Sequence, residues 1–75
     1  MKDSQIRYYK RLGLNIAFYR KMRERSQEKL AEQVNISRTH MSRIENASCA
    51  VSLDVVFDIA EALNIDPCKL FQDKE

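Results

Sequence analysis

Residues 26–46 read SQEKLAEQVNISRTHMSRIEN, and this stretch decides the fold. Ser26 and Ser37 each precede a helical pattern, and a serine hydroxyl in that place accepts hydrogen bonds from the free amides of a first helical turn. Asn35 lies between the two patterns and belongs to the few non-glycine residues that tolerate a left-handed backbone. The stretch therefore predicts a short helix, a tight turn and a second helix over about 38–46.

The second of these helices has one apolar face and one polar face. Met41 and Ile44 are expected to point inward, three residues apart. The outward face carries the candidate base-contacting residues Arg38, Thr39, Ser42 and Arg43. This pattern is what a helix-turn-helix needs, because one helix crosses the DNA backbone while the other enters the major groove.

Arginine suits this face chemically, since its two parallel donors match the O6 and N7 acceptors of guanine. We expect Arg43 and Thr39 to read bases. Arg38 lies near the start of the helix, where a phosphate contact is the alternative to a base contact. Phosphate contacts position a protein on DNA without carrying sequence information directly.

A long helix is expected before this pair, over about 6–23. Its apolar residues recur at steps of three and four, which places them on one face. They are Tyr9, Leu12, Ile16 and Tyr19. Gly13 interrupts this helix and weakens it by about 1 kcal/mol relative to alanine.

Two further helices are expected after the pair. One covers about 53–63 and should bury Leu53 among its apolar residues. The last is short and begins at Asp66-Pro67, an N-cap followed by proline in the first helical position. It should turn Leu70 and Phe71 inward. The expectation is an all-α, compact five-helix fold in a single domain over residues 1–75.

Composition supports this fold class and excludes others. The chain has 75 residues, of which 44% are hydrophobic and 32% charged, so a folded globular protein is expected. One Gly and one Pro leave few tight turns for an all-β fold. No apolar run reaches the roughly 20 residues of a membrane span, and no signal-peptide pattern begins the chain. We therefore expect a cytoplasmic, nucleoid-associated protein.

The cysteines and histidine do not predict a metal centre or a catalytic site. Cys49 and Cys68 are too few for a disulfide framework, and their role is left open. Together with the single His they fall one ligand short of a four-ligand zinc site. No nucleophile–base pair or phosphate loop is visible, so no metal, cofactor, small-molecule ligand or enzymatic activity is expected.

Charge is distributed unevenly along the chain. Residues 1–25 hold eight basic and two acidic side chains, whereas residues 51–75 hold two basic and six acidic ones. Such asymmetry indicates one surface that faces a polyanion and one that does not. Nucleic acid is the expected polyanion, with patchy charge on an ordinary helical domain as the alternative.

Residues 12–71 resemble the lambda-repressor-like (Cro/repressor, XRE) helix-turn-helix family. The matching residues are Arg20, Ser26, Gln27, Leu30, Ala31, Ile36, Ser37, Ile44, Glu45, Asn46, Leu53, Ala60, Leu63 and Ile65. The resemblance places the helix-turn-helix proper at about 27–46. It implies a transcriptional regulator, expected to be a repressor, that binds an inverted-repeat operator in double-stranded DNA as a homodimer.

The resemblance also implies roles for single residues. Gln27, Ser37 and Asn46 match positions that contact DNA phosphates. Arg20 and Glu45 match an ion pair that ties the first helix to the recognition helix.

Two departures from the family pattern affect these expectations. Ala47 stands where the family commonly has glycine, so the left-handed helix stop is less favourable there. The following loop, residues 48–50, lacks the basic residue often found in the family. Phosphate attraction should then depend on Lys29, on the basic first helix and on helix N-termini.

Leu14 and Phe18 lie on the side of the first helix opposite its apolar face. We expect them to form an exposed patch for self-association or a partner, with Phe71 nearby; the alternative is that residues 1–8 fold back and cover them. A protein-interaction module on the same fold, such as the antidote half of a toxin pair, is the alternative function. The outward Arg38 and Arg43 favour DNA binding.

Overall fold

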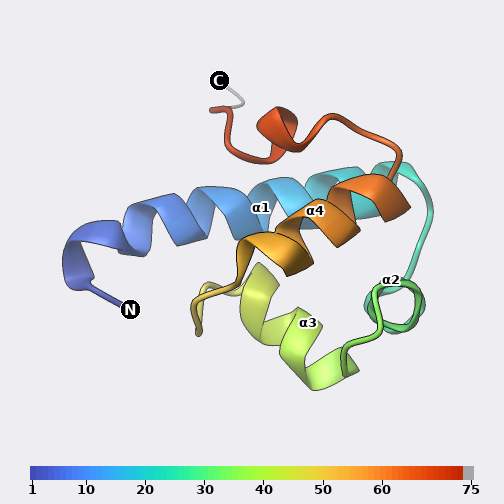
Figure 1. The fold of residues 1–75 in the computed structure, drawn as a ribbon, viewed down its shortest axis with the longest axis horizontal. Coiled ribbons are helices and arrows are strands. Elements are labelled where there is room, and N and C mark those ends of the chain that lie inside the picture. Colours follow the sequence, from blue (N-terminus) through green and yellow to red (C-terminus); the bar gives the residue numbers. More distant parts are fainter. Residues whose placement is uncertain (74–75) are drawn as a thin grey trace.

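The computed structural model describes residues 1–73, and over this range it is built from helices without a strand. The elements in chain order are η1 (Asp3–Gln5), α1 (Ile6–Met22), α2 (Gln27–Gln33), α3 (Arg38–Glu45), α4 (Leu53–Ala62) and η2 (Pro67–Leu70) (Figure 1). The prediction of an all-α fold is confirmed. The expected fifth helix is the 3-10 helix η2, and the 3-10 helix η1 was not predicted.

Side-chain caps begin the helices where the sequence predicts them. Ser26 Oγ accepts from the backbone N–H of Lys29, and Ser37 Oγ accepts from that of His40, both at 3.0 Å. The hydroxyl of Ser52 and the carboxylate of Asp66 do the same for α4 and η2. These bonds satisfy amides that would otherwise lack a partner in the first turn, so the starts of α2, α3, α4 and η2 are fixed locally, whereas α1 begins without a side-chain cap.

Each of the four α-helices is followed by a residue with a left-handed backbone, and none of these residues is glycine. They are Glu24, Asn35, Ala47 and Asn64, with φ between 56° and 60°. Ala47 adopts the stop that was in doubt: its φ is 57°, its N–H donates to the carbonyl of Ile44, and the N–H of Ser48 donates to the carbonyl of Arg43 at 2.9 Å. The two hydrogen bonds form although a Cβ makes this conformation unfavourable.

The core lies where the four helices meet. Its buried side chains are Leu12, Ile16, Leu30, Ala31, Val34, Met41, Ile44, Val56, Ile59, Ala60, Leu63 and Leu70. Two residues predicted to be inside lie outside instead. Leu53 is 61% exposed because it occupies the first turn of α4, at the edge of the core. Phe71 is 46% exposed, since neighbouring side chains in a 3-10 helix diverge by about 120° and Leu70 takes the inward direction.

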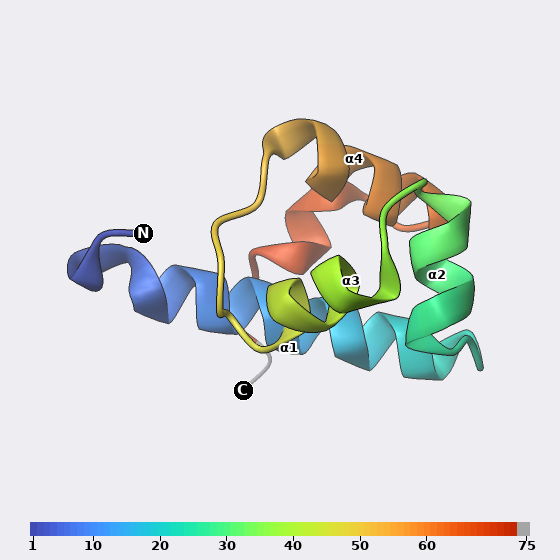
Figure 2. The same ribbon diagram turned by 90° about the horizontal axis from the view of Figure 1, so that it is seen from below.

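The helices are arranged around α1, the longest element. In Figure 1, α3 lies on one side of α1 and residues 67–70 lie on the other. The first turns of α1 project beyond the remaining helices in both views (Figures 1 and 2). None of the described helices combines the length and apolar character required to cross a membrane.

The crossing of α1 and α3 is unusually close and takes place at Gly13. A Cβ atom on Gly13 would lie 2.5 Å from the carbonyl oxygen of Glu45 and 2.7 Å from that of Ile44. The residue that weakens α1 in isolation is thus the one that lets the end of α3 approach it. This role depends on the tertiary crossing, so no local sequence pattern indicates it.

A buried asparagine ties the C-terminal segment to α1. Asn15 is 3% exposed, and its Nδ2 donates to the carbonyls of Leu70 and Gln72, both at 2.8 Å. Both amide hydrogens are used, so burial of this polar group is compensated. Because α1 and η2 are held together in this way, α1 serves as a fixed base for α3 on its other side.

Candidate nucleic-acid interface

The outward face of α3 and the start of α2 together form one polar surface. Arg38, Thr39 and Arg43 are exposed, while Ser42 and Gln27 are half-buried. All five line a single shallow hollow. The structure therefore brings the four candidate base-contacting residues together with Gln27, which the sequence placed on the preceding helix.

The hollow is suited to an anionic, hydrogen-bonding ligand. It is lined by two guanidinium groups, two hydroxyls and an amide, with no carboxylate among its lining residues. Within residues 1–73, neither Arg38 nor Arg43 forms an ion pair or a side-chain hydrogen bond. Their donors are therefore available to phosphate oxygens or to the acceptor edge of a guanine.

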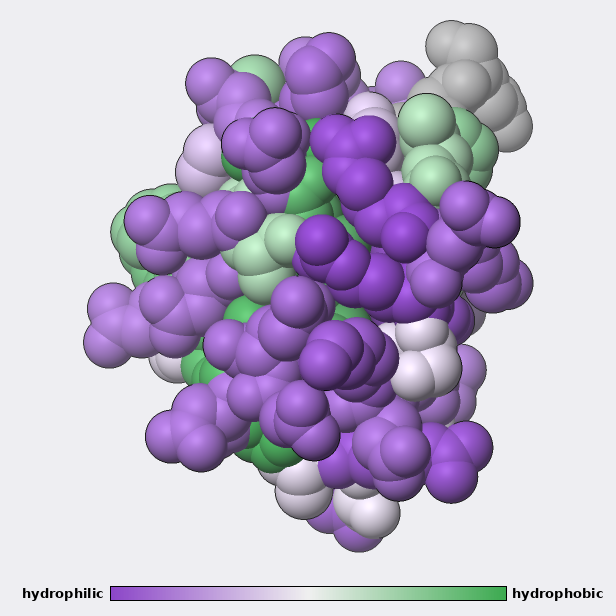
Figure 3. Space-filling model, turned by 90° about the vertical axis from the view of Figure 1, so that its right-hand side faces the viewer, coloured by the Kyte–Doolittle hydropathy of each residue, from purple (hydrophilic) through white to green (hydrophobic). Residues whose placement is uncertain are grey.

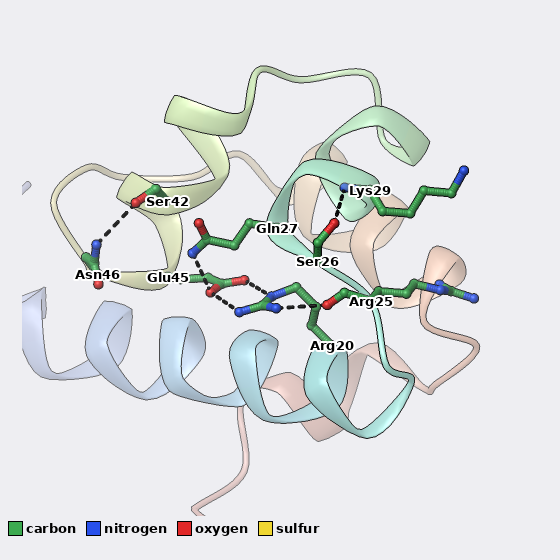
Figure 4. Close-up of polar contacts among 8 residues, drawn as sticks. All are labelled: Arg20, Arg25, Ser26, Gln27, Lys29, Ser42, Glu45 and Asn46. Carbon is green, nitrogen blue, oxygen red and sulfur yellow. Dashed lines mark hydrogen bonds and ion pairs between the residues drawn. The ribbon is translucent and has the colours of Figure 1, made fainter.

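An ion pair holds α3 against α1. Arg20 Nε lies 2.7 Å from Glu45 Oε2, and Arg20 Nη2 lies 3.0 Å from Glu45 Oε1 (Figure 4). The Nη1 of the same guanidinium donates to the carbonyl of Arg25 at 2.8 Å. The side chains of the pair are 11% and 5% exposed. A bidentate pair with this little exposure fixes direction as well as distance, so it sets the orientation of α3.

Gln27 extends this network to α2. Its Nε2 donates to Glu45 Oε1 at 2.9 Å (Figure 4). An amide nitrogen carries two hydrogens, so one remains for a phosphate oxygen. The side chain is thus oriented by Glu45 before any ligand arrives.

The other predicted phosphate-contacting residues lie around the hollow. Lys29 extends away from α3 in Figure 4, and its Nζ lies 3.5 Å from a carboxylate oxygen of Glu32. The Ser37 hydroxyl is occupied as the N-cap of α3. Asn46 follows the C-terminal end of α3, where its Nδ2 donates to Ser42 Oγ at 3.4 Å. Gln27, held by Glu45, and Asn46 therefore both lie toward the C-terminal end of α3, with Lys29 directed elsewhere.

The two cysteines lie away from this surface. Cys68 is exposed in η2 and Cys49 is half-buried in the loop after α3. A hydrogen bond to Asp66 raises the pKa of the Cys68 thiol, and the backbone N–H of Cys68 lowers the pKa of the Asp66 carboxyl. A raised pKa leaves less thiolate at neutral pH, so Cys68 is a weak nucleophile. In the described part of the chain, no three His, Cys, Asp or Glu side chains gather where a metal ion could bind.

The exposed apolar residues form two separate groups. Leu14 and Phe18 are 69% and 45% exposed, so residues 1–8 do not cover them. Phe71 lines a different groove, with Tyr8 and Leu53, while Asp73, two residues further along, lines the hollow beside Leu14 and Phe18. The joint role of Leu14, Phe18 and Phe71 as an interface stays a prediction.

Comparison with known proteins identifies the family of this chain. The helix-turn-helix family model matches residues 16–70. The crystal structure of the restriction-modification controller protein C.AhdI from Aeromonas hydrophila is similar, with a TM-score of 0.81 and 30% identity over 84% of this chain and 96% of that one. Two structures of the clp gene regulator ClgR from Corynebacterium glutamicum share the fold at 21% identity. Their TM-scores are 0.82 and 0.80, and the matches cover 84% of this chain and 67% and 82% of theirs. No curated protein matches the chain by sequence.

Proposed function

Because the chain belongs to the XRE-type helix-turn-helix family of DNA-binding transcription regulators, we propose that it is a repressor that binds an inverted-repeat operator as a homodimer. The observation that carries this proposal is the polar hollow on α2 and α3, lined by unpaired arginines and hydroxyls. Occupation of the operator then blocks polymerase sterically.

In this binding mode α3 enters the major groove. Arg43 and Thr39 read base edges, assisted by Ser42, and Arg38 contacts a base or the adjoining phosphate. Phosphates are held by Gln27, Ser37, Asn46 and Lys29, for which Lys29 must leave its contact with Glu32. In a twofold dimer the two half-sites lie about 10–10.5 base pairs apart, centre to centre.

Selection from a random duplex pool tests this function. At about 150 mM salt, where non-specific binding is weak, the wild type is expected to select an inverted repeat. Arg43→Ala is expected to relax one position in each half-site and to weaken binding by about 1–3 kcal/mol per half-site, because a bidentate contact is lost in each.

Arg11→Ala is the matched control, since this arginine lies on α1 and does not line the hollow. It should return the same operator as the wild type. If a well-folded wild-type protein selects no motif, the proposed function fails. A protein partner then becomes the better hypothesis.

The groove lined by Tyr8, Leu53 and Phe71 is the proposed dimer interface. A twofold interface brings the same patch of both copies together. The Leu14–Phe18 group is bordered by three basic residues of α1 and by Asp73, so a twofold contact there would bring two net-positive patches together. The side of the molecule on which α2 lies is largely hydrophilic (Figure 3), so it offers mostly polar surface to a second copy.

Phe71→Glu is therefore expected to convert the dimer to a monomer, because it buries a charge in an apolar contact. Sedimentation velocity at micromolar concentration measures the change. Phe18→Glu serves as the control and should sediment like the wild type. A dimer that survives Phe71→Glu but dissociates in Phe18→Glu would place the interface on the Leu14–Phe18 patch instead.

A further inference from the structure

A second hollow lies between α1 and the end of the recognition helix. It is lined by Lys10, Leu14, Glu45, Asn46 and Ala47. The close crossing at Gly13 brings these parts together, since the carbonyls of Ile44 and Glu45 meet α1 there. A lysine of the first helix thus borders the residue that follows α3, although the two are far apart in sequence.

Lys10 differs from Arg7 and Arg11, its basic neighbours on α1, because its charged group has no partner among residues 1–73. Arg7 Nη2 donates to the Tyr8 hydroxyl at 2.8 Å, with its guanidinium carbon 4.8 Å from the centre of that ring. Arg11 Nη2 lies 3.9 Å from a carboxylate oxygen of Asp73. Within residues 1–73, Lys10 forms neither an ion pair nor a side-chain hydrogen bond. Its ammonium group is therefore available to an external anion.

The end of α3 needs such a cation if it is to approach a phosphate. A helix C-terminus carries a partial negative charge, which repels an anion. Residues 47–52 read ASCAVS, so the loop after α3 supplies no basic side chain. The Glu45 carboxylate is 5% exposed and is paired with Arg20, so it adds little repulsion. Lys10 is the cation that borders this hollow.

We propose that Lys10 and Asn46 together bind one phosphate of the DNA backbone at the C-terminal end of the recognition helix. This inference rests on the proposed function. An eight-residue helix such as α3 is about 12 Å long, which is close to the width of the major groove. When α3 occupies the groove, its C-terminal end therefore approaches a phosphate backbone.

Salt titration of operator binding tests the role of Lys10. Each phosphate neutralised by a cation contributes about 0.9 to the slope of log affinity against log salt. Lys10→Ala removes one contact in each half-site, so it is expected to lower this slope by about 1.8 for the dimer without changing the selected sequence. Between 50 and 200 mM salt, the ratio of wild-type to variant affinity should then shrink about 12-fold. Ethylation interference should lose one phosphate per half-site in the variant.

Two controls separate this contact from a general effect of net charge. Arg11→Ala removes a cation one residue away that points toward Asp73, and Lys69→Ala removes one on η2, across α1 from α3. Both should keep the wild-type slope and interference pattern. Equal slope changes in all three variants, or an unchanged slope in Lys10→Ala, would overturn the role of Lys10 while leaving the proposed function intact. Absence of any specific binding by the wild type would overturn both.

Discussion

Gly13→Ala is expected to lower the free energy of unfolding by about 2 kcal/mol. Alanine is the better helix former by about 1 kcal/mol, but its Cβ would lie 2.5 Å from the Glu45 carbonyl oxygen. That oxygen belongs to the backbone of α3 and cannot rotate away, so α1 and α3 must separate. Overpacking of this kind typically costs about 1–3 kcal/mol or more. The melting temperature should fall by roughly 4–8 °C for each kcal/mol in a domain of this size.

Thermal and urea unfolding measure the change. Leu14→Ala is the control, because Leu14 is the next residue on α1 and its side chain is exposed. Its stability should stay close to that of the wild type. If Gly13→Ala is more stable than the wild type, Gly13 only weakens α1, and the crossing of α1 and α3 does not require glycine. The clash is also directed at the end of α3, so operator affinity should fall even at temperatures where the variant is folded.

Glu45→Ala is expected to be the most destabilising single change, by about 3–5 kcal/mol. It removes the carboxylate that accepts two hydrogen bonds from Arg20 and one from Gln27. The Arg20 guanidinium is 11% exposed and would keep only the Arg25 carbonyl as its partner. Removing one member of a buried pair leaves an uncompensated charge, which explains the size of the effect.

A double variant distinguishes an unpaired charge from lost packing. Replacing both partners by apolar residues of similar size, Arg20→Met with Glu45→Leu, should recover most of the stability, because neither charge is then buried. Urea unfolding of the single and double variants gives the coupling energy. If the double variant is as unstable as Glu45→Ala, the pair contributes net stability of its own. If it is stable but binds the operator weakly, the ion pair acts by orienting α3.

Local sequence signals predicted most of the fold. Ser26 and Ser37 begin α2 and α3 because a capping hydroxyl acts within one turn of the helix, and apolar periodicity identified the inward side of each helix. The errors arise where partners are distant in the chain. Leu53 fits the apolar pattern of α4 yet lies beyond the core, and the role of Gly13 depends on how closely α3 crosses α1.

The residues of the candidate site also fall into those that local sequence predicts and those whose position depends on tertiary packing. The outward direction of Arg38 and Arg43 follows from helix geometry alone, so the sequence predicted it. The grouping of Gln27 with them depends on the angle between α2 and α3, which the family resemblance supplied. Lys10 carried no sequence signal as an individual residue, because its position beside Asn46 results from tertiary packing. The direction of Lys29 goes with a local contact on α2, because Glu32 lies three residues further along the same helix.

The four left-handed helix ends bear on how long a molecule of this protein survives in a cell. Asparagine tolerates this conformation, but at Glu24 and Ala47 the Cβ costs roughly 1–2 kcal/mol per residue, and a small domain has only about 5–15 kcal/mol of stability in total. A loss of 1–2 kcal/mol raises the unfolded fraction by a factor of about 5–30. Proteases act on that fraction, so steady-state abundance changes several-fold. A chain whose helix ends carry this cost is therefore held at a lower level than one with glycine at the same positions.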